Sequence, residues 1–139
     1  MASKTITVKG NPVRGEKYAN AAITPGHLCE FISTDRIQKQ AGDSTRFLPM
    51  FALENSLIGS EIGDAYASGE QVQYGIFNAG DEVYAWLSDG ETVVIGDELM
   101  AGTTDGELLK QTSTNVAIAV AKEAVTTSGA AGRITAIIL

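Results

Sequence analysis

The sequence predicts a mostly-β protein that folds as a compact barrel or roll. Fifteen glycines against three prolines, in a chain of 139 residues, indicate many tight turns. Short apolar runs recur between turn signals, and two of those signals are the pairs Asp89-Gly90 and Asp105-Gly106. A chain with many short strands and frequent turns closes into a barrel, roll or sandwich. The apolar share of 44% is ordinary for one soluble domain of this length.

Residues 1–20 are predicted to form an extended N-terminal arm that carries a short strand. Ile6 and Val8 alternate with Thr5 and Thr7, which is the period-2 pattern of a strand, and a proline near residue 12 ends it. A basic segment with few large apolar residues buries little against its own domain, so we expect it either to be disordered or to bind a neighbouring protein. The alternative is an ordinary first strand of the domain's own sheet. The predicted binding residues are Lys4, Thr5, Ile6, Thr7, Val8, Lys9, Arg14 and Lys17.

Residues 21–139 are predicted to form a single β-rich domain. Strands are expected at residues 28–33, 46–53 and 71–77, and Pro49 indicates that the second of these is an edge strand or contains a bulge. The polar residues 34–40 predict a turn of helix or a loop. Residues 55–70 contain three glycines and predict a loop.

The second half of the chain predicts further strands. Residues 82–88 and 91–95 are expected to form a hairpin around Asp89-Gly90, because a type I′ turn needs positive φ at its central residues. Short strands are expected at 98–101 and 107–112. Residues 115–122 place three β-branched residues on one face and alanines on the other, which favours a strand, with a helix as the alternative. Residues 133–139 predict a final strand with Ile134, Ala136 and Ile138 on one face.

The net charge of −7 is unevenly distributed. Residues 1–50 carry seven basic and four acidic side chains, whereas residues 51–110 carry twelve acids and one lysine. Nucleic acid and anionic membrane surfaces both require a basic footprint, so neither is an expected partner. The first residues alternate polar and apolar side chains, and no apolar run has the length of a signal peptide core or a membrane span. We therefore expect synthesis in a cytosol.

No catalytic or metal-binding pattern emerges from the sequence. Cys29 is the only cysteine and His27 the only histidine, and Cys29 is predicted to be an inert buried thiol. The spacings that bind zinc, calcium, phosphate or dinucleotides are lacking. The acidic residues of the predicted turns are expected to be solvated: Asp81, Glu82, Glu91, Asp97 and Glu98. The sequence predicts no enzyme and no cofactor.

Four aromatic residues allow two interpretations. Tyr66, Tyr74, Tyr84 and Trp86 either fill and rim the β core, which we favour, or form an exposed sugar-binding face. Tyr74 and Tyr84 are candidates for cross-strand neighbours. Exposure of all four on one face would distinguish the two interpretations.

A series of weak motifs, taken in order, resembles the capsid decoration (cement) proteins of tailed phages and prophages. The motifs are FALEN at residues 51–55, DAY at 64–66, GEQV at 69–72, VYAWL at 83–87, GDEL at 96–99 and AVAKEA at 119–124, with Gly90 and Asp105-Gly106. The resemblance covers roughly residues 25–139.

The resemblance implies a β-tulip-like domain with an N-terminal arm. It also implies an oligomer, expected to be a trimer, that binds the major capsid protein on the outside of an expanded head and stabilises the shell against internal pressure. The protein would be made in the bacterial host's cytoplasm and would need no cofactor. The alternatives are another head, tail or fibre-associated β protein of a phage, and a carbohydrate-binding or adhesion module on the particle.

Overall fold

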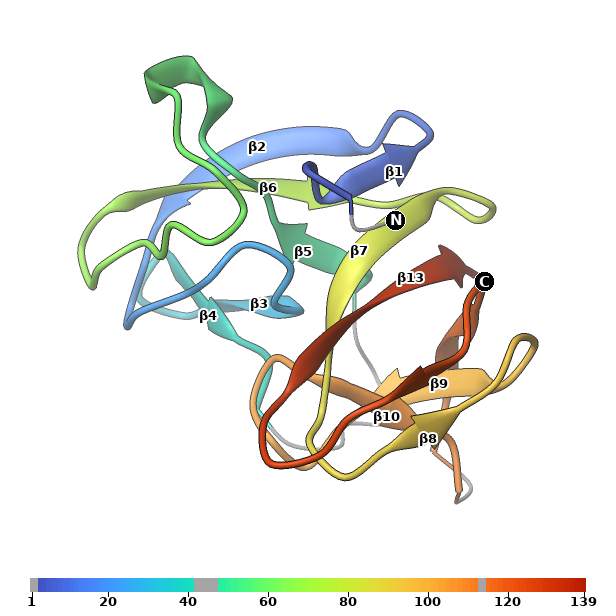
Figure 1. Cartoon of the computed structure of the whole chain (residues 1–139). Helices are drawn as coiled ribbons and strands as arrows, with labels where there is room; N and C mark the ends of the chain where they lie inside the picture. Colours follow the sequence, from blue (N-terminus) through green and yellow to red (C-terminus); the bar gives the residue numbers. More distant parts are fainter. Residues whose placement is uncertain (1–2, 42–47, 113–114) are drawn as a thin grey trace.

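The computed structural model describes residues 3–41, 48–112 and 115–139, and these are nearly all β or loop (Figure 1). Within them the one helical element is a 3-10 turn, η1 (Ser56–Ile58). The mostly-β prediction is confirmed. The strands are β1 (Thr7–Lys9), β2 (Val13–Tyr18), β3 (Cys29–Ile32), β4 (Arg36–Lys39), β5 (Met50–Ala52), β6 (Gln71–Ile76), β7 (Glu82–Leu87), β8 (Thr92–Val93), β9 (Glu98–Ala101), β10 (Leu108–Lys110), β11 (Ala117–Ala121), β12 (Val125–Thr126) and β13 (Gly132–Ile138).

Five strands form a closed barrel. Their order is β7-β10-β9-β11-β13, and β13 pairs with β7 to complete the circle. The β7–β13 contact is antiparallel and runs from Gly132↔Leu87 to Ile137↔Glu82. β1 is a sixth strand, which pairs with β7 at one end of the sheet order. Closure satisfies the backbone groups that an open sheet would leave unpaired at its edges.

The rest of the chain forms smaller sheets beside the barrel. β2, β6 and β5 make an antiparallel sheet in that order, and β2 pairs with β6 from Val13↔Ile76 to Tyr18↔Gln71. β5 lies at the edge of this sheet directly after Pro49, as predicted. β3 and β4 form a hairpin, and β8 pairs with β12.

Two hydrophobic clusters hold these sheets together. The barrel cluster includes the fully buried Leu87, Leu99 and Ile134, and the second cluster includes Ile37 and Met50. Burial of one such aliphatic side chain contributes about 1.5–3 kcal/mol. In β13 the residues on the predicted inner face are indeed buried: Ile134, Ala136 and Ile138.

The first twenty residues do not form an arm apart from the domain in this structure. β1 pairs with β7, and β2 pairs with β6 over its whole length. Ile6 is 0% exposed and belongs to the barrel cluster. The physical reason is that Ile6 and strand β1 cover apolar surface of the barrel that would otherwise be exposed to water. The alternative of an ordinary first strand describes residues 7–9.

The predicted hairpin at Asp89-Gly90 is wrong, although the turn exists. Gly90 has φ +80°, but Asp89 does not have a positive φ, so the turn is not of the predicted type I′. β7 pairs along its length with β13, while β8 pairs with β12. The hairpin forms instead at the second pair, Asp105-Gly106, where β9 and β10 are antiparallel.

Two further predictions need correction. Residues 34–40 contain a strand, β4, because Asp35 adopts φ +61° and turns the chain back along β3. In β11 the buried residues are Ala119 and Ala121 together with Ile118, so the bulky side chains do not share one core face. A register irregularity between Ala117 and Ala119 places consecutive residues inward.

Candidate docking surface

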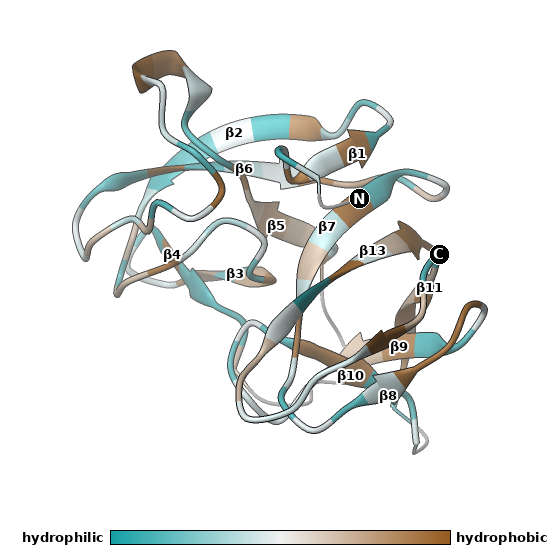
Figure 2. Ribbon diagram, viewed as in Figure 1, coloured by the Kyte–Doolittle hydropathy of each residue, from teal (hydrophilic) through white to brown (hydrophobic). Residues whose placement is uncertain are grey.

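A loop between β5 and β6 projects from the sheets, and we call its residues 54–65 the finger. It is the green segment that stands away from the other elements in Figure 1, and Figure 2 shows its tip in brown. The tip is η1, whose Leu57 and Ile58 are 85% and 76% exposed. An exposed apolar group with a polar rim is typical of a contact surface. The finger is therefore the first candidate for docking.

Hydrogen bonds within the finger fix its shape. The backbone N–H groups of Ile58 and Ser60 donate to the carbonyl oxygen of Asn55, at 3.3 and 3.0 Å. Gly59 N–H donates to Ser56 O at 3.2 Å, and its φ of +76° lets the chain turn back at the tip. A loop that is already ordered loses less conformational entropy when it binds.

Two anchors hold the base of the finger to the barrel. The N–H of Ile6 donates to Glu54 Oε2 at 3.1 Å, next to strand β1. Arg133 of β13 donates from Nη2 to the carbonyl oxygen of Ile62 at 2.7 Å. The finger is thus fixed to the residue before β1 and to barrel strand β13, which are distant in sequence.

Arg133 is also the centre of a half-buried aromatic cluster. Its guanidinium carbon lies 4.1 Å from the centroid of the Trp86 ring and 5.7 Å from that of Tyr84. Nη1 donates to Pro25 O at 2.8 Å, and Trp86 Nε1 donates to the same oxygen at 3.0 Å. His27 stacks on Trp86 at 5.6 Å between centroids. Burial lowers the pKa of Arg133. The cluster joins the barrel, the loop before β3 and the finger.

The finger is acidic. Residues 54–65 include Glu54, Glu61 and Asp64 and no basic residue. The N–H of Glu61 donates to Asp64 Oδ2 at 2.8 Å, which holds one carboxylate against the backbone of the loop. Both residues are exposed. A partner surface with basic groups around an apolar hollow would complement this end of the molecule.

A hollow of that type lies beside the β3–β4 hairpin, and we call it the β3–β4 groove. Its volume is about 310 Å³. Phe31, which is 46% exposed, supplies an apolar surface and contacts Tyr74 edge to face at 5.7 Å. Arg36 Nη1 donates to Ala19 O at 3.0 Å. The residues that line the groove are Lys17, Phe31, Ile32, Asp35 and Arg36.

The predicted binding residues have mixed environments. Lys4, Thr5, Lys9 and Arg14 are exposed, Thr7 and Val8 are half-buried, and Ile6 is buried. Lys17 pairs with Asp35 and lines the β3–β4 groove. We call Lys4, Lys9 and Arg14 the basic strand surface: they lie before β1, at the end of β1 and in β2. Among the described residues, no ion pair engages any of these three cations.

Sequence reasoning missed the finger and the groove. The available signal was the pair Leu57-Ile58, two large aliphatic residues in a glycine-containing loop without strand periodicity. The exposure of Phe31 carried no local signal, because its own strand pattern equally fits a buried residue.

The four aromatic residues do not share one exposed face. Tyr66 is 6% exposed and its hydroxyl donates to Leu53 O at 2.7 Å. Tyr74 lies in β6, where it pairs with Gly15 and Ala52 rather than with Tyr84. The predicted Tyr74–Tyr84 pairing is wrong, and the arrangement favours core and rim roles over a sugar-binding face.

Cys29 is a buried thiol, as predicted. It is 1% exposed, and burial raises the pKa of the thiol to about 12. Its Sγ lies 3.3 Å from the carbonyl oxygen of His27, so its partner is backbone and not imidazole. The His27 Nδ1 atom instead accepts from Thr24 N–H at 3.1 Å. Burial lowers the pKa of His27 to about 4.

One predicted solvated carboxylate is in fact buried. Glu82 is 7% exposed and its Oε1 lies 2.7 Å from Lys122 Nζ. Asp97 lies on the surface, and its pKa is lowered by the hydrogen bond from Val94 N–H and by Lys110. The turn assignment failed at Glu82 because this residue is the first of strand β7.

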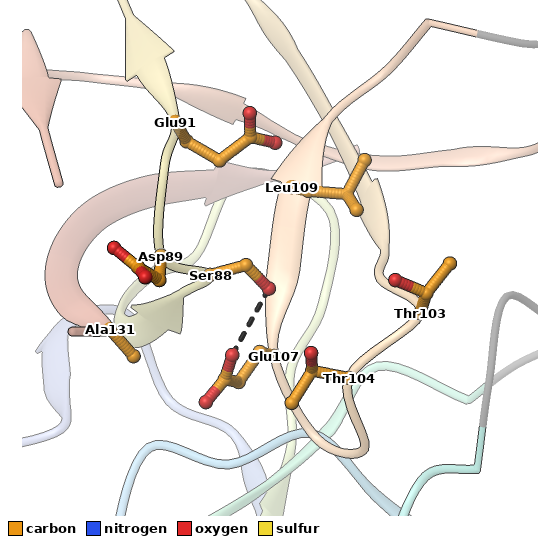
Figure 3. Close-up of a pocket in the computed structure, with 8 residues that line it drawn as sticks. All are labelled: Ser88, Asp89, Glu91, Thr103, Thr104, Glu107, Leu109 and Ala131. Carbon is orange, nitrogen blue, oxygen red and sulfur yellow. Dashed lines mark hydrogen bonds between the residues drawn. The ribbon is translucent and has the colours of Figure 1, made fainter. Parts of the chain in front are cut away.

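A polar hollow of about 440 Å³ lies between three turns at one end of the barrel (Figure 3). Ser88 Oγ donates to Glu107 Oε1 at 3.0 Å, and Lys110 N–H donates to Glu91 Oε1 at 2.9 Å. No imidazole lines the hollow, so Ser88 has no base of the kind that activates a serine. The lining residues are Ser88, Asp89, Glu91, Thr103, Thr104, Glu107, Leu109 and Ala131.

The described parts of the chain contain neither a metal-ligand cluster nor a membrane-spanning helix. No group of three or more His, Cys, Asp or Glu side chains in residues 3–41, 48–112 and 115–139 is placed to hold a metal ion. Among the same residues, no helix is long and apolar enough to cross a bilayer.

Comparison with known proteins finds a likeness of fold. No protein-family model matches the chain, and no curated sequence matches it significantly. Among solved structures, the fold is similar to that of the N base of head fiber gp8.5 in bacteriophage phi29, with a TM-score of 0.61. The likeness covers 91% of this chain and 93% of that chain at 16% sequence identity. At this identity the likeness establishes a shared fold.

Proposed function

We propose that this chain is a structural protein of a tailed-phage virion, which decorates the outside of an expanded capsid as an oligomer, expected to be a trimer, and stabilises the shell. The observation that carries the proposal is the fold likeness to the base of a phage head fiber, which spans nearly the whole of both chains. The ordered set of motifs from residue 51 onward supports the β-tulip decoration type.

The basic strand surface is the proposed contact with the major capsid protein. Lys4, Lys9 and Arg14 are exposed and free of ion pairs to other described residues. β1 pairs with β7 and with no other described strand, and we expect a strand of the partner to add at its second edge. Each such contact is small, and an oligomer that binds through several of them gains affinity by multivalency.

The test is a charge-neutralised variant, Lys4→Gln, Lys9→Gln and Arg14→Gln. We expect its affinity for expanded capsids to fall at least about tenfold in co-sedimentation, which corresponds to about 1.4 kcal/mol. Deletion of residues 1–9 is a poor test, because it removes Ile6 from the core.

A matched control makes the same change in net charge elsewhere. Thr92→Glu, Thr112→Glu and Ser128→Glu alter three exposed residues on other parts of the surface. This control variant should bind expanded capsids normally. Equal binding by the neutralised variant and the wild type would refute the role of the basic strand surface.

The base of a head fiber is a second candidate function, favoured by the same structural likeness. Cross-linking of intact virions followed by mass spectrometry separates the two. A decoration protein should cross-link to capsid protein and to itself, whereas a fiber base should also cross-link to a fiber chain.

A further inference from the structure

We propose that the finger binds the β3–β4 groove of a second copy of this chain, so that subunits associate head to tail. The proposal deepens the proposed function, because it assigns the contact that would build the oligomer. Leu57 and Ile58 would cover Phe31 of the neighbouring copy, with the finger carboxylates beside the groove's cations.

Charge complementarity supports a second copy as the occupant. The finger has no basic residue, and its acid Glu54 is hydrogen-bonded to the N–H of Ile6. The groove carries Lys17 and Arg36 against one acid, Asp35. The finger's two exposed acids are Glu61 and Asp64. Asp35 is already paired with Lys17. The groove therefore keeps a net positive charge that faces an acidic finger of net charge −2 from these two residues.

The finger tip and the groove also both present apolar side chains that could pack together. The tip has two adjacent aliphatic side chains, 85% and 76% exposed, and the groove has Phe31 and Ile32 on its wall. Phe31 is 46% exposed and is held by its edge-to-face contact with Tyr74, so the ring is positioned before a partner arrives. Both halves of the contact are therefore preformed.

The two halves consist of different residues, so the contact is heterologous. A heterologous contact generates a ring when the rotation closes, and every subunit then gives one finger and accepts one. Two side chains in a groove cover far less than the roughly 800 Å² per partner of a stable interface. Ring closure, with two contacts per subunit, would supply the missing stability.

The contact can be trapped with variants of the full chain that each carry one added cysteine. Cys29 is buried and its thiol pKa is about 12, so it does not compete for oxidation. Ile58→Cys and Phe31→Cys chains are mixed and mildly oxidised. We expect the mixed disulfide dimer to exceed either homodimer at least tenfold. Ile95→Cys, at an exposed position of the β8–β9 turn, is the control and should give no excess with Phe31→Cys.

Analytical ultracentrifugation gives a second readout without new cysteines. The wild-type mass should be a multiple of the 14.6 kDa monomer, and Leu57→Ser with Ile58→Ser should weaken association at least tenfold. The control pair Val94→Ser with Ile95→Ser removes an apolar pair of similar exposure and should have no effect. A monomeric wild type, or equal association of the finger variant, would overturn the proposal.

Capsid co-sedimentation separates this inference from the proposed function. If the wild type is monomeric and the finger variant loses capsid binding, the occupant is the capsid protein and the self-association proposal is wrong. If the head-to-tail cross-link forms but the chain binds no capsid, the self-association proposal is supported and the decoration function is wrong.

Discussion

Replacement of Arg133 by methionine is the most informative test of what holds the molecule together. The variant keeps an unbranched apolar side chain but removes the guanidinium that contacts Pro25 O, Ile62 O and the Trp86 ring. If these contacts join the barrel to the finger and to the loop before β3, their loss should destabilise the whole domain.

The magnitude follows from the individual contacts. A hydrogen bond to a charged group contributes about 1.5–3 kcal/mol and a cation–π contact about 0.5–2 kcal/mol. Several effects reduce the sum: Trp86 still donates to Pro25 O, water can reach the half-buried Ile62, and methionine relieves the desolvation of the buried cation. We expect a net loss of about 2–4 kcal/mol in the free energy of unfolding.

The assay is urea unfolding followed by fluorescence, because Trp86 is the only tryptophan and lies against the mutated side chain. The melting temperature should fall by about 10 °C. Arg14→Met is the control, since Arg14 is exposed, and it should change the stability by no more than about 0.5 kcal/mol. A loss below about 1 kcal/mol for Arg133→Met would refute the reasoning.

Three further predictions concern the same region of the molecule. Gly26→Ala should cost about 2–4 kcal/mol, because a Cβ at φ +98° would lie 2.4 Å from Arg133 Nη1. Gly90→Ala, at φ +80° with open space around it, should cost only about 1 kcal/mol, and equal losses would contradict the steric argument. Since the folded-state pKa of His27 is about 4 and its ordinary value is 6.5, only the unfolded chain takes up this proton between those values. Stability should therefore decline by up to about 3 kcal/mol from pH 6.5 to pH 4, and His27→Asn should lack this component; an identical pH profile would exclude it. Finally, Cys29 should react with a thiol reagent at pH 8 only after unfolding, as followed by absorbance, and rapid labelling of the folded protein would show that the thiol is accessible.

The local pattern of apolar and polar residues was sufficient to predict many of the strands. The alternation of Ile134, Ala136 and Ile138 predicted the inner face of β13, because the period of a strand is set by its own backbone. The positions of two turns were also found correctly, since Gly90 and Gly106 both have positive φ, although Asp89 does not have the positive φ that a type I′ turn needs.

The pairing of the strands could not be predicted from the local sequence pattern. Asp89-Gly90 makes a turn, yet β7 pairs with β13, which lies more than forty residues away in sequence. That choice depends on barrel closure, and no neighbouring residue encodes it. The same holds for Ile6, whose burial depends on the barrel cluster that it completes.

The candidate docking surface was only partly predictable. The basic residues Lys4, Lys9 and Arg14 were identified by composition, and their exposure agrees with a role in contact. The finger tip and Phe31 were missed because the same residue types fill the core elsewhere in the chain. Whether an aliphatic side chain is covered is a property of the tertiary structure.

Co-sedimentation of the purified protein with undecorated capsids from its source phage tests the central claim most directly. Expanded capsids and unexpanded procapsids are compared over a range of protein concentrations. The account predicts saturable binding to the expanded shell, at a fixed small-integer ratio to the capsid protein. An absence of binding to either shell would contradict the decoration function.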